Sequence, residues 1–88
     1  MNIIPPNKSF EVQLRISNNR DCETLLVIEP WGEVYKMPSM SAHLVVITGD
    51  QQQLIDVEWI DEYTITIYGW PTGTVQVFDN GKQISPSR

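Results

Sequence analysis

Apolar and polar residues alternate through most of this chain, and the alternation predicts short β-strands. Residues 54–70, with the sequence LIDVEWIDEYTITIYGW, contain two alternating runs that are separated by Asp61 and Glu62. Side chains two positions apart share one face of a strand, so this stretch predicts a β-hairpin with one apolar, aromatic face. A hairpin alone is marginally stable in water, so other strands are expected to cover that face.

Six further strands follow from the same reasoning. Residues 10–16 alternate strictly between apolar and polar, as in a strand with one face in water. Residues 24–29 and 42–48 are apolar on both faces, which predicts two central, buried strands. Shorter strands are expected at residues 34–37 and 74–78, and a last brief one that ends at Ile84.

Residues that bend the backbone lie between these strands, and together they predict the fold class. Asn80-Gly81 is the strongest of these signals, because both residues tolerate the positive φ of a tight hairpin turn. No window has the period of a helix. The pattern predicts a single small antiparallel β-sandwich, Ig-like or cupredoxin-like in shape, with seven to eight short strands. Residues 1–9 are expected to form an N-terminal arm, residues 10–84 the sandwich and residues 85–88 a C-terminal tail.

Trp59 is expected to point into the core, where the two sheets meet, because it shares a strand face with Ile55 and Val57. If so, its truncation to alanine removes about 3–5 kcal/mol of stability.

Composition narrows the function classes. The 88 residues suit one domain, and the formal net charge of −5 with six Lys plus Arg leaves no basic stripe. Binding to a nucleic-acid backbone is therefore disfavoured, whereas a basic protein partner suits the chain. The single cysteine, Cys22, and the lack of a leader or of a membrane-spanning run predict a complete cytoplasmic protein.

Candidate catalytic and metal sites are weak. A blue-copper site needs two imidazoles, and His43 is the only histidine. A nucleophilic pair of Cys22 and His43 lacks a third residue to orient the imidazole, so a turn thiol and a solvent-contacting histidine at a strand end are the simpler interpretation. No cofactor is predicted.

Carboxylates cluster on the central hairpin. Asp56 and Glu58 are expected to stand about 6–7 Å apart on one strand face, a spacing that glycoside hydrolysis can use. A flat strand face offers no pocket in which one acid stays protonated, so a solvated face is the simpler interpretation. A divalent cation held by these two residues with Asp61 and Glu62 is a lesser alternative, because the spacing of a calcium loop is absent.

Two tryptophans in turns are the main candidates for binding. Trp31 lies in Pro30-Trp31-Gly32 and Trp70 in Gly69-Trp70-Pro71. They are expected either to close the ends of the sandwich, the favoured interpretation, or to form an aromatic contact surface. As a surface they would be rimmed by acidic residues and extended by tyrosines: Glu29, Glu33, Asp61, Glu62, Tyr35, Tyr63 and Tyr68.

The EPWG turn at residues 29–32 and the YGWP turn at residues 68–71 resemble a motif pair in small uncharacterised bacterial all-β proteins. The resemblance extends over most of residues 10–84. It implies a sandwich that stands alone, and it brings no active site.

Taken together, the sequence predicts a non-enzymatic protein-binding module, an adaptor or an inhibitor, that holds a basic partner through Trp31, Trp70, Tyr68, Glu33, Asp61 and Glu62. The alternative is a carbohydrate-binding module that stacks sugars on the two turn tryptophans. A homodimer through an edge strand stays open.

Overall fold

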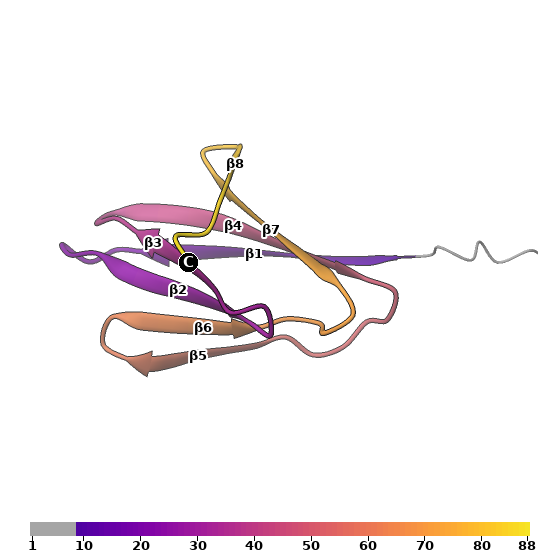
Figure 1. Cartoon of the computed structure of the whole chain (residues 1–88). Helices are drawn as coiled ribbons and strands as arrows, with labels where there is room; N and C mark the ends of the chain where they lie inside the picture. Colours follow the sequence, from indigo (N-terminus) through magenta and orange to yellow (C-terminus); the bar gives the residue numbers. More distant parts are fainter. Residues whose placement is uncertain (1–8) are drawn as a thin grey trace, which may run out of the picture.

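The computed structural model describes residues 9–88, and that range contains eight β-strands and no helix (Figure 1). In chain order the strands are β1 (Phe10–Asn18), β2 (Thr24–Glu29), β3 (Glu33–Met37), β4 (Ser41–Gly49), β5 (Asp56–Asp61), β6 (Thr64–Tyr68), β7 (Thr74–Asp79) and β8 (Lys82–Ile84). They form two packed sheets, so the predicted all-β sandwich is confirmed. Of the predicted N-terminal arm, residues 1–8 lie outside the described residues.

Each sheet has four strands. The first sheet has the order β1-β4-β7-β8 and the second the order β3-β2-β6-β5. Strands β2 and β4 were predicted to be central from their two-sided apolar sequences, and each indeed has a neighbour on both sides. The residues of these strands that face the other sheet are buried, and Leu25, Val27 and Leu44 on the outer faces are half-buried between neighbouring strands.

One strand pair departs from the predicted antiparallel arrangement. All neighbouring strands are antiparallel except β2 and β6, which run parallel with Leu26 opposite Ile65 and Ile28 opposite Ile67. The chain leaves the second sheet for β4 and returns through β5 before it forms β6, so no tight turn fixes the direction of β6 against β2.

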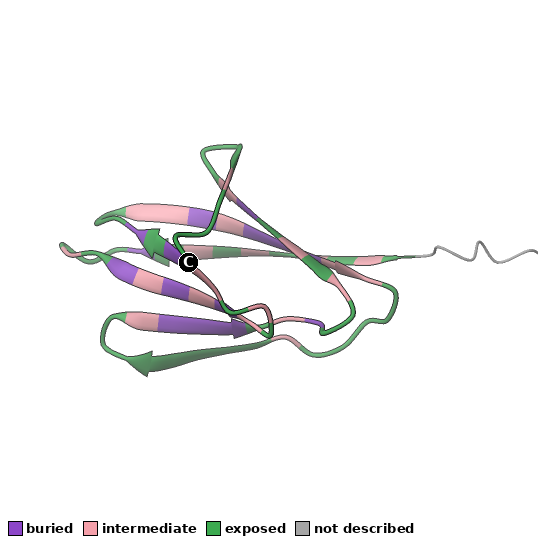
Figure 2. Cartoon of the chain, viewed as in Figure 1, coloured by how far each residue is buried: buried purple, intermediate pink, exposed green. Residues whose placement is uncertain are grey.

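The core lies between the sheets and draws on both of them. Strand β2 contributes Leu26 and Ile28, strand β4 contributes Val45 and Ile47, and strand β6 contributes Ile65 and Ile67 to one buried cluster. In each strand these residues are two positions apart, as the alternation requires. Figure 2 shows the resulting bands of burial on β2, β4 and β6.

Both predicted hairpins are present. Strand β5 pairs with β6, and β7 pairs with β8. At the second turn, Asn80 has φ 52° and Gly81 has φ 77°, as the Asn-Gly signal predicted.

A buried amide joins two connections of the fold. The Asn18 side-chain nitrogen donates to the carbonyl oxygens of Cys22, Met37 and Pro38, at 2.9, 3.1 and 3.0 Å. Its side-chain oxygen accepts the backbone N–H of Arg20 at 3.0 Å. Asn18 is the last residue of β1, and its side chain holds the β1–β2 connection against the end of β3.

The predicted C-terminal tail is bound to the edge of the second sheet. The Ser87 N–H donates to the Val34 carbonyl at 2.6 Å, and the Val34 N–H donates to the Arg88 carbonyl at 2.9 Å. The last residues therefore cover the outer edge of β3. Short polar ends carry no strand pattern of their own, so this contact was not predictable from alternation.

The prediction that Trp59 is a core residue is wrong. Its side chain is 51% exposed, and every residue of β5 is exposed. Trp59 lies opposite Ile65, so it does point to the inner side of its sheet, as the alternation predicted. Strand β5 is, however, the last strand of the second sheet, and the first sheet does not cover it. Truncation of Trp59 therefore empties no core site, and the loss of about 3–5 kcal/mol is not expected.

Candidate functional site

The most unusual surface of the described chain is strand β5 with the residues beside it. We call the exposed side chains of residues 54–63 the β5 surface. Its large apolar members are exposed to between 46% and 90%, and they are Leu54, Val57, Trp59, Ile60 and Tyr63. Figure 2 shows β5 exposed along its whole length, in contrast to its neighbour β6. Single exposed apolar residues are ordinary, but several large ones on and beside one strand make this the candidate contact surface of the described residues.

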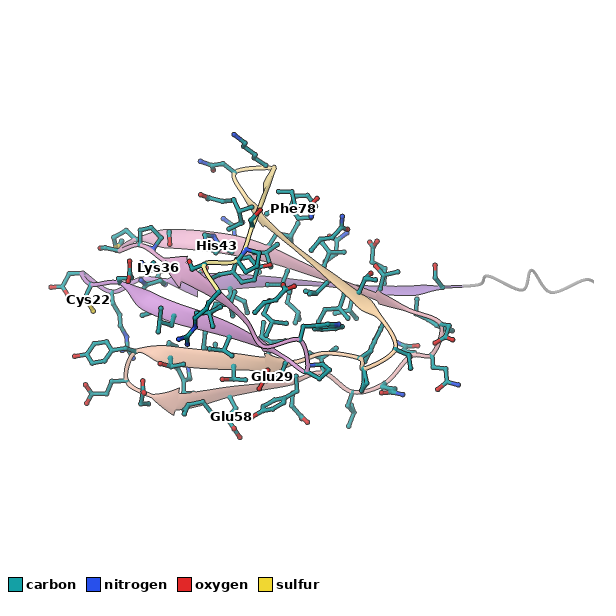
Figure 3. The ribbon with its side chains drawn as sticks, viewed as in Figure 1. Cys22, Glu29, Lys36, His43, Glu58 and Phe78 are labelled. Carbon is teal, nitrogen blue, oxygen red and sulfur yellow. The ribbon has the colours of Figure 1, made fainter. Side chains whose placement is uncertain are left out.

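The two sides of β5 carry different chemistry. Val57 and Trp59 are paired with Ile67 and Ile65, so they extend the inner, apolar side of the second sheet beyond the part that the first sheet covers. Asp56 and Glu58 alternate with them and lie on the outer side. Figure 3 shows Glu58 pointing away from the sandwich. One side of the strand is therefore apolar and the other is acidic.

The outer edge of β5 also has free backbone groups. Within residues 9–88, the backbone of β5 bonds only to β6, and no further backbone hydrogen bond reaches residues 56–60. In an edge strand every second residue directs its N–H and C=O away from the sheet. These groups are available to another strand.

Arg20 stacks on the aromatic part of the β5 surface. Its guanidinium carbon lies 4.9 Å from the centre of the Trp59 ring and 6.0 Å from that of Tyr63. Arg20 belongs to the connection after β1, and its backbone is bound to Asn18, Ser39 and Met40. The contact thus fixes the two rings and brings a positive charge to one end of the apolar side.

The carboxylates of the β5 surface are Asp56, Glu58, Asp61 and Glu62, and all are exposed. Asp61 accepts the backbone N–H of Tyr63 at 2.8 Å and so closes the hairpin turn. The Tyr68 hydroxyl donates to Glu58 at 3.4 Å. Loss of hydration and the nearby Glu58 carboxylate raise the pKa of Tyr68. Of the predicted binding residues, Tyr68, Asp61 and Glu62 are exposed in this region.

Trp70 is not available to a partner, contrary to its place among the predicted binding residues. Its side chain is 1% exposed and belongs to the core cluster, and its indole N–H donates to the Gln53 carbonyl at 2.9 Å. The favoured interpretation, that this ring closes the sandwich, is confirmed. A sugar cannot stack on it, so the carbohydrate alternative loses one of its two rings.

Trp31 is half-buried against the core, and it explains why the two turn motifs occur together. A Cβ built on Gly69 would lie 2.7 Å from the Trp31 ring, so the ring occupies space that only glycine leaves open. The Gly69 N–H also donates to the Glu29 carbonyl at 2.7 Å. Because β2 and β6 are parallel neighbours, their C-terminal ends coincide and the EPWG and YGWP turns meet.

Glu33 and Tyr35 bind each other rather than forming part of an aromatic contact surface. The Tyr35 side chain is 3% exposed, and its hydroxyl donates to Glu33 at 2.7 Å. Burial raises the pKa of Tyr35 well above its ordinary value, and the hydrogen bond and the charge of Glu33 act in the same direction. The prediction that Tyr35 extends an exposed patch is wrong, and Glu33 is half-buried.

His43 is buried, and the expectation of ordinary solvent contact is wrong. His43 faces the same side of β4 as Val45 and Ile47, so its ring lies between the sheets with 2% of its surface exposed. Its Nδ1 is 4.0 Å from the Asp79 carboxylate, and its Nε2 is 3.4 Å from the Lys36 carbonyl oxygen. Figure 3 places Cys22 in a turn at one end of the molecule, away from His43, so the two do not form a nucleophilic pair.

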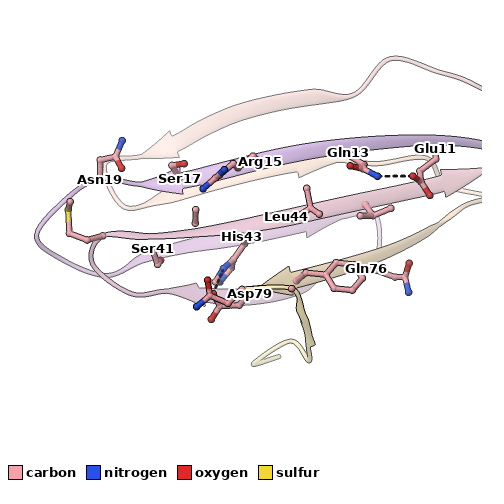
Figure 4. A pocket seen from close by; sticks show the side chains of 16 residues that line it. Glu11, Gln13, Arg15, Ser17, Asn19, Ser41, His43, Leu44, Gln76 and Asp79 are labelled. Atoms are coloured by element: carbon pink, nitrogen blue, oxygen red, sulfur yellow. Dashed lines mark hydrogen bonds and ion pairs between the residues drawn. The ribbon is translucent and has the colours of Figure 1, made fainter.

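The outer face of the first sheet is hollowed to a volume of about 990 Å³ (Figure 4). Its floor is apolar, with Leu44 and Val46 of β4 and Phe78 of β7, and Gln13, Arg15 and Gln76 rim it.

Among residues 9–88, no three His, Cys, Asp or Glu side chains converge on a point where a metal ion could bind. The same range has no helix of the length and apolarity that crossing a bilayer requires.

The sequence indicated the acidic residues of the β5 surface but not its exposure. A strand with three carboxylates among six residues is typical of a sheet edge, and this signal favours an edge position over a core position.

Comparisons with known protein families, curated protein sequences and solved structures found no match for this chain.

Proposed function

We propose that this chain is a non-enzymatic, cytoplasmic protein-binding module, an adaptor or an inhibitor, that holds a basic protein partner on its β5 surface. The observation that carries the proposal is the exposure of Val57, Trp59 and Ile60 on a strand that also presents Asp56 and Glu58. In protein interfaces, an aromatic side chain that becomes buried on binding and is surrounded by charged residues contributes much of the binding energy.

Charge supports a basic partner. The chain has a net charge of −5, and four carboxylates belong to the β5 surface itself. Such a field accelerates encounter with a cationic partner, and the acceleration falls as salt screens it.

Affinity capture from an extract of the producing cells tests the proposal. The variants are Trp59→Ala, which removes the anchor, and Asp56→Lys with Glu58→Lys, which reverses the charge. Glu11→Lys is the control for a charge reversal outside the β5 surface, because Glu11 is an exposed carboxylate on the first sheet. Thermal unfolding of each variant confirms that it is folded.

The expected result is a basic protein that the wild type and Glu11→Lys retain, that both β5 variants lose, and that elutes from the wild type as salt rises. Equal capture by the β5 variants and the wild type contradicts the proposed function.

A further inference from the structure

We infer that the partner binds as an added strand on the outer edge of β5, with basic side chains next to Asp56 and Glu58 and apolar side chains next to Val57 and Trp59. This inference rests on the proposed function and specifies how the same surface recognises its partner. It commits the partner to an extended segment in which apolar and basic residues alternate.

Of the four strands at the edges of the two sheets, β5 is the most open to pairing with another strand. The outer edge of β3 is covered by Ser87 and Arg88, and β8 is only three residues long. On β1 the apolar residues are half-buried. Its other side is exposed and polar, and it includes Glu11 and Arg15. Cover by other residues and shortness protect the edges of β3 and β8, and β1 has no exposed large apolar side chain that could anchor a partner. Strand β5 is the one that combines an open edge with exposed Val57 and Trp59.

The geometry of a strand pair then sets the partner's sequence pattern. Neighbouring strands place paired side chains on the same side of the sheet. Residues of the added strand that share the inner side with Val57 and Trp59 should therefore be apolar, and those between them should be Lys or Arg. Arg20 stands over Trp59 on the inner side and would repel a cation placed there, which fixes the basic residues to the outer side.

A second copy of this chain is a poor occupant of the same edge. Pairing β5 with its own copy across a two-fold axis would place Asp56 and Glu58 beside the same carboxylates of the other molecule. Like charges opposite one another destabilise a strand pair, whereas opposite charges stabilise it. The carboxylates of β5 therefore discriminate against self-pairing and favour a basic strand.

A synthetic peptide in which lysine and valine alternate over the length of β5 is the probe. Two modified peptides carry N-methyl groups, one on every valine amide and the other on every lysine amide. Alternate residues of a strand direct their N–H groups to opposite edges, so each modification blocks one edge and leaves charge and side chains unchanged. Binding is measured by fluorescence anisotropy at low salt, with the wild type, Glu58→Lys and Glu11→Lys.

Strand addition requires that one methylated peptide binds at least about tenfold more weakly than the unmodified one, since two or three hydrogen bonds are lost, while the other keeps its affinity. Which of the two loses affinity tells whether the added strand is parallel or antiparallel. Glu58→Lys should weaken binding of the unmodified peptide, and Glu11→Lys should not.

Equal binding of both methylated peptides overturns strand addition, yet it leaves the proposed function standing on the capture experiment. Failure of the unmodified peptide to bind overturns the inference as well. Sedimentation of the chain alone at neutral pH distinguishes the remaining occupant, because a dimer that Glu58→Lys changes would assign this edge to a second copy.

Discussion

The alternation of apolar and polar residues tells which side of a strand a side chain faces, but it does not tell whether that side chain is buried. Trp59 faces the same side of its sheet as the core residue Ile65, and Trp70 lies in a turn. Trp70 is nevertheless buried, and Trp59 is half exposed. Parity tells which side of a sheet a residue faces. Whether the other sheet extends over that residue depends on strand order, which the sequence pattern does not contain.

The two tryptophans should therefore differ in their effect on stability. Trp70→Ala is expected to lower the free energy of unfolding by about 3–5 kcal/mol, because it empties a core site and leaves the Gln53 carbonyl without its donor. Trp59→Ala is expected to lower it by about 1 kcal/mol, mainly through the lost contact with Arg20. Urea unfolding measures both. Equal effects would show that the first sheet does cover β5.

Tyr35 gives the protein a predictable response to alkaline pH. Burial, with the hydrogen bond to Glu33, raises the pKa of this hydroxyl in the folded state. Its stabilising effect is complete at pH values below the unfolded pKa of about 10, where the phenol is neutral in both states. Above that pH the unfolded chain loses a proton that the folded chain keeps, so the free energy of unfolding falls, by up to about 1.4 kcal/mol per pH unit.

The comparison of wild type with Tyr35→Phe isolates this effect. The variant has no hydroxyl to ionise, so the stability difference between the two proteins should depend on pH above about 10 and be constant between pH 7 and 9. Urea unfolding at each pH provides the measurement. A difference that stays constant up to pH 11 would mean that the Tyr35 hydroxyl ionises as easily in the folded state as in the unfolded one.

At the scale of the strands, much of the fold was predictable from the sequence. The apolar runs identified β2 and β4 as central, and Asn80-Gly81 identified the last hairpin, because these features follow from local backbone preference and burial. The parallel pairing of β2 with β6 was not predictable, since it depends on how three intervening strands cross between the sheets. The contact between Trp31 and Gly69 depends on that pairing. The exposure of β5 was hidden for the same reason, although its carboxylates pointed to an edge.

Removal of Ser87 and Arg88 tests the role of the C-terminal residues as a cover for β3. The truncated chain loses the two backbone hydrogen bonds to Val34, each of which contributes about 0.5–1.5 kcal/mol, so a loss of about 1–3 kcal/mol is expected in urea unfolding. Arg88→Ala is the matched control, because it keeps the backbone and should keep the stability. Amide exchange at Val34 should become faster only in the truncated chain, and an unchanged rate there would show that these residues do not cover the edge.

For the whole molecule, net charge decides whether the open edge leads to self-association. At pH 7 the carboxylates of β5 repel a second copy, but near the pI of about 4.5 the net charge vanishes and the exposed apolar side chains favour association. Sedimentation velocity should therefore show a monomer at pH 7 and larger species near pH 4.5. Val57→Lys should remain monomeric at both, because it introduces a like charge into any β5–β5 pair. Thr74→Lys, an exposed substitution on β7 with the same change in net charge, should associate as the wild type does. If both lysine variants behave alike, net charge rather than the β5 edge controls the association.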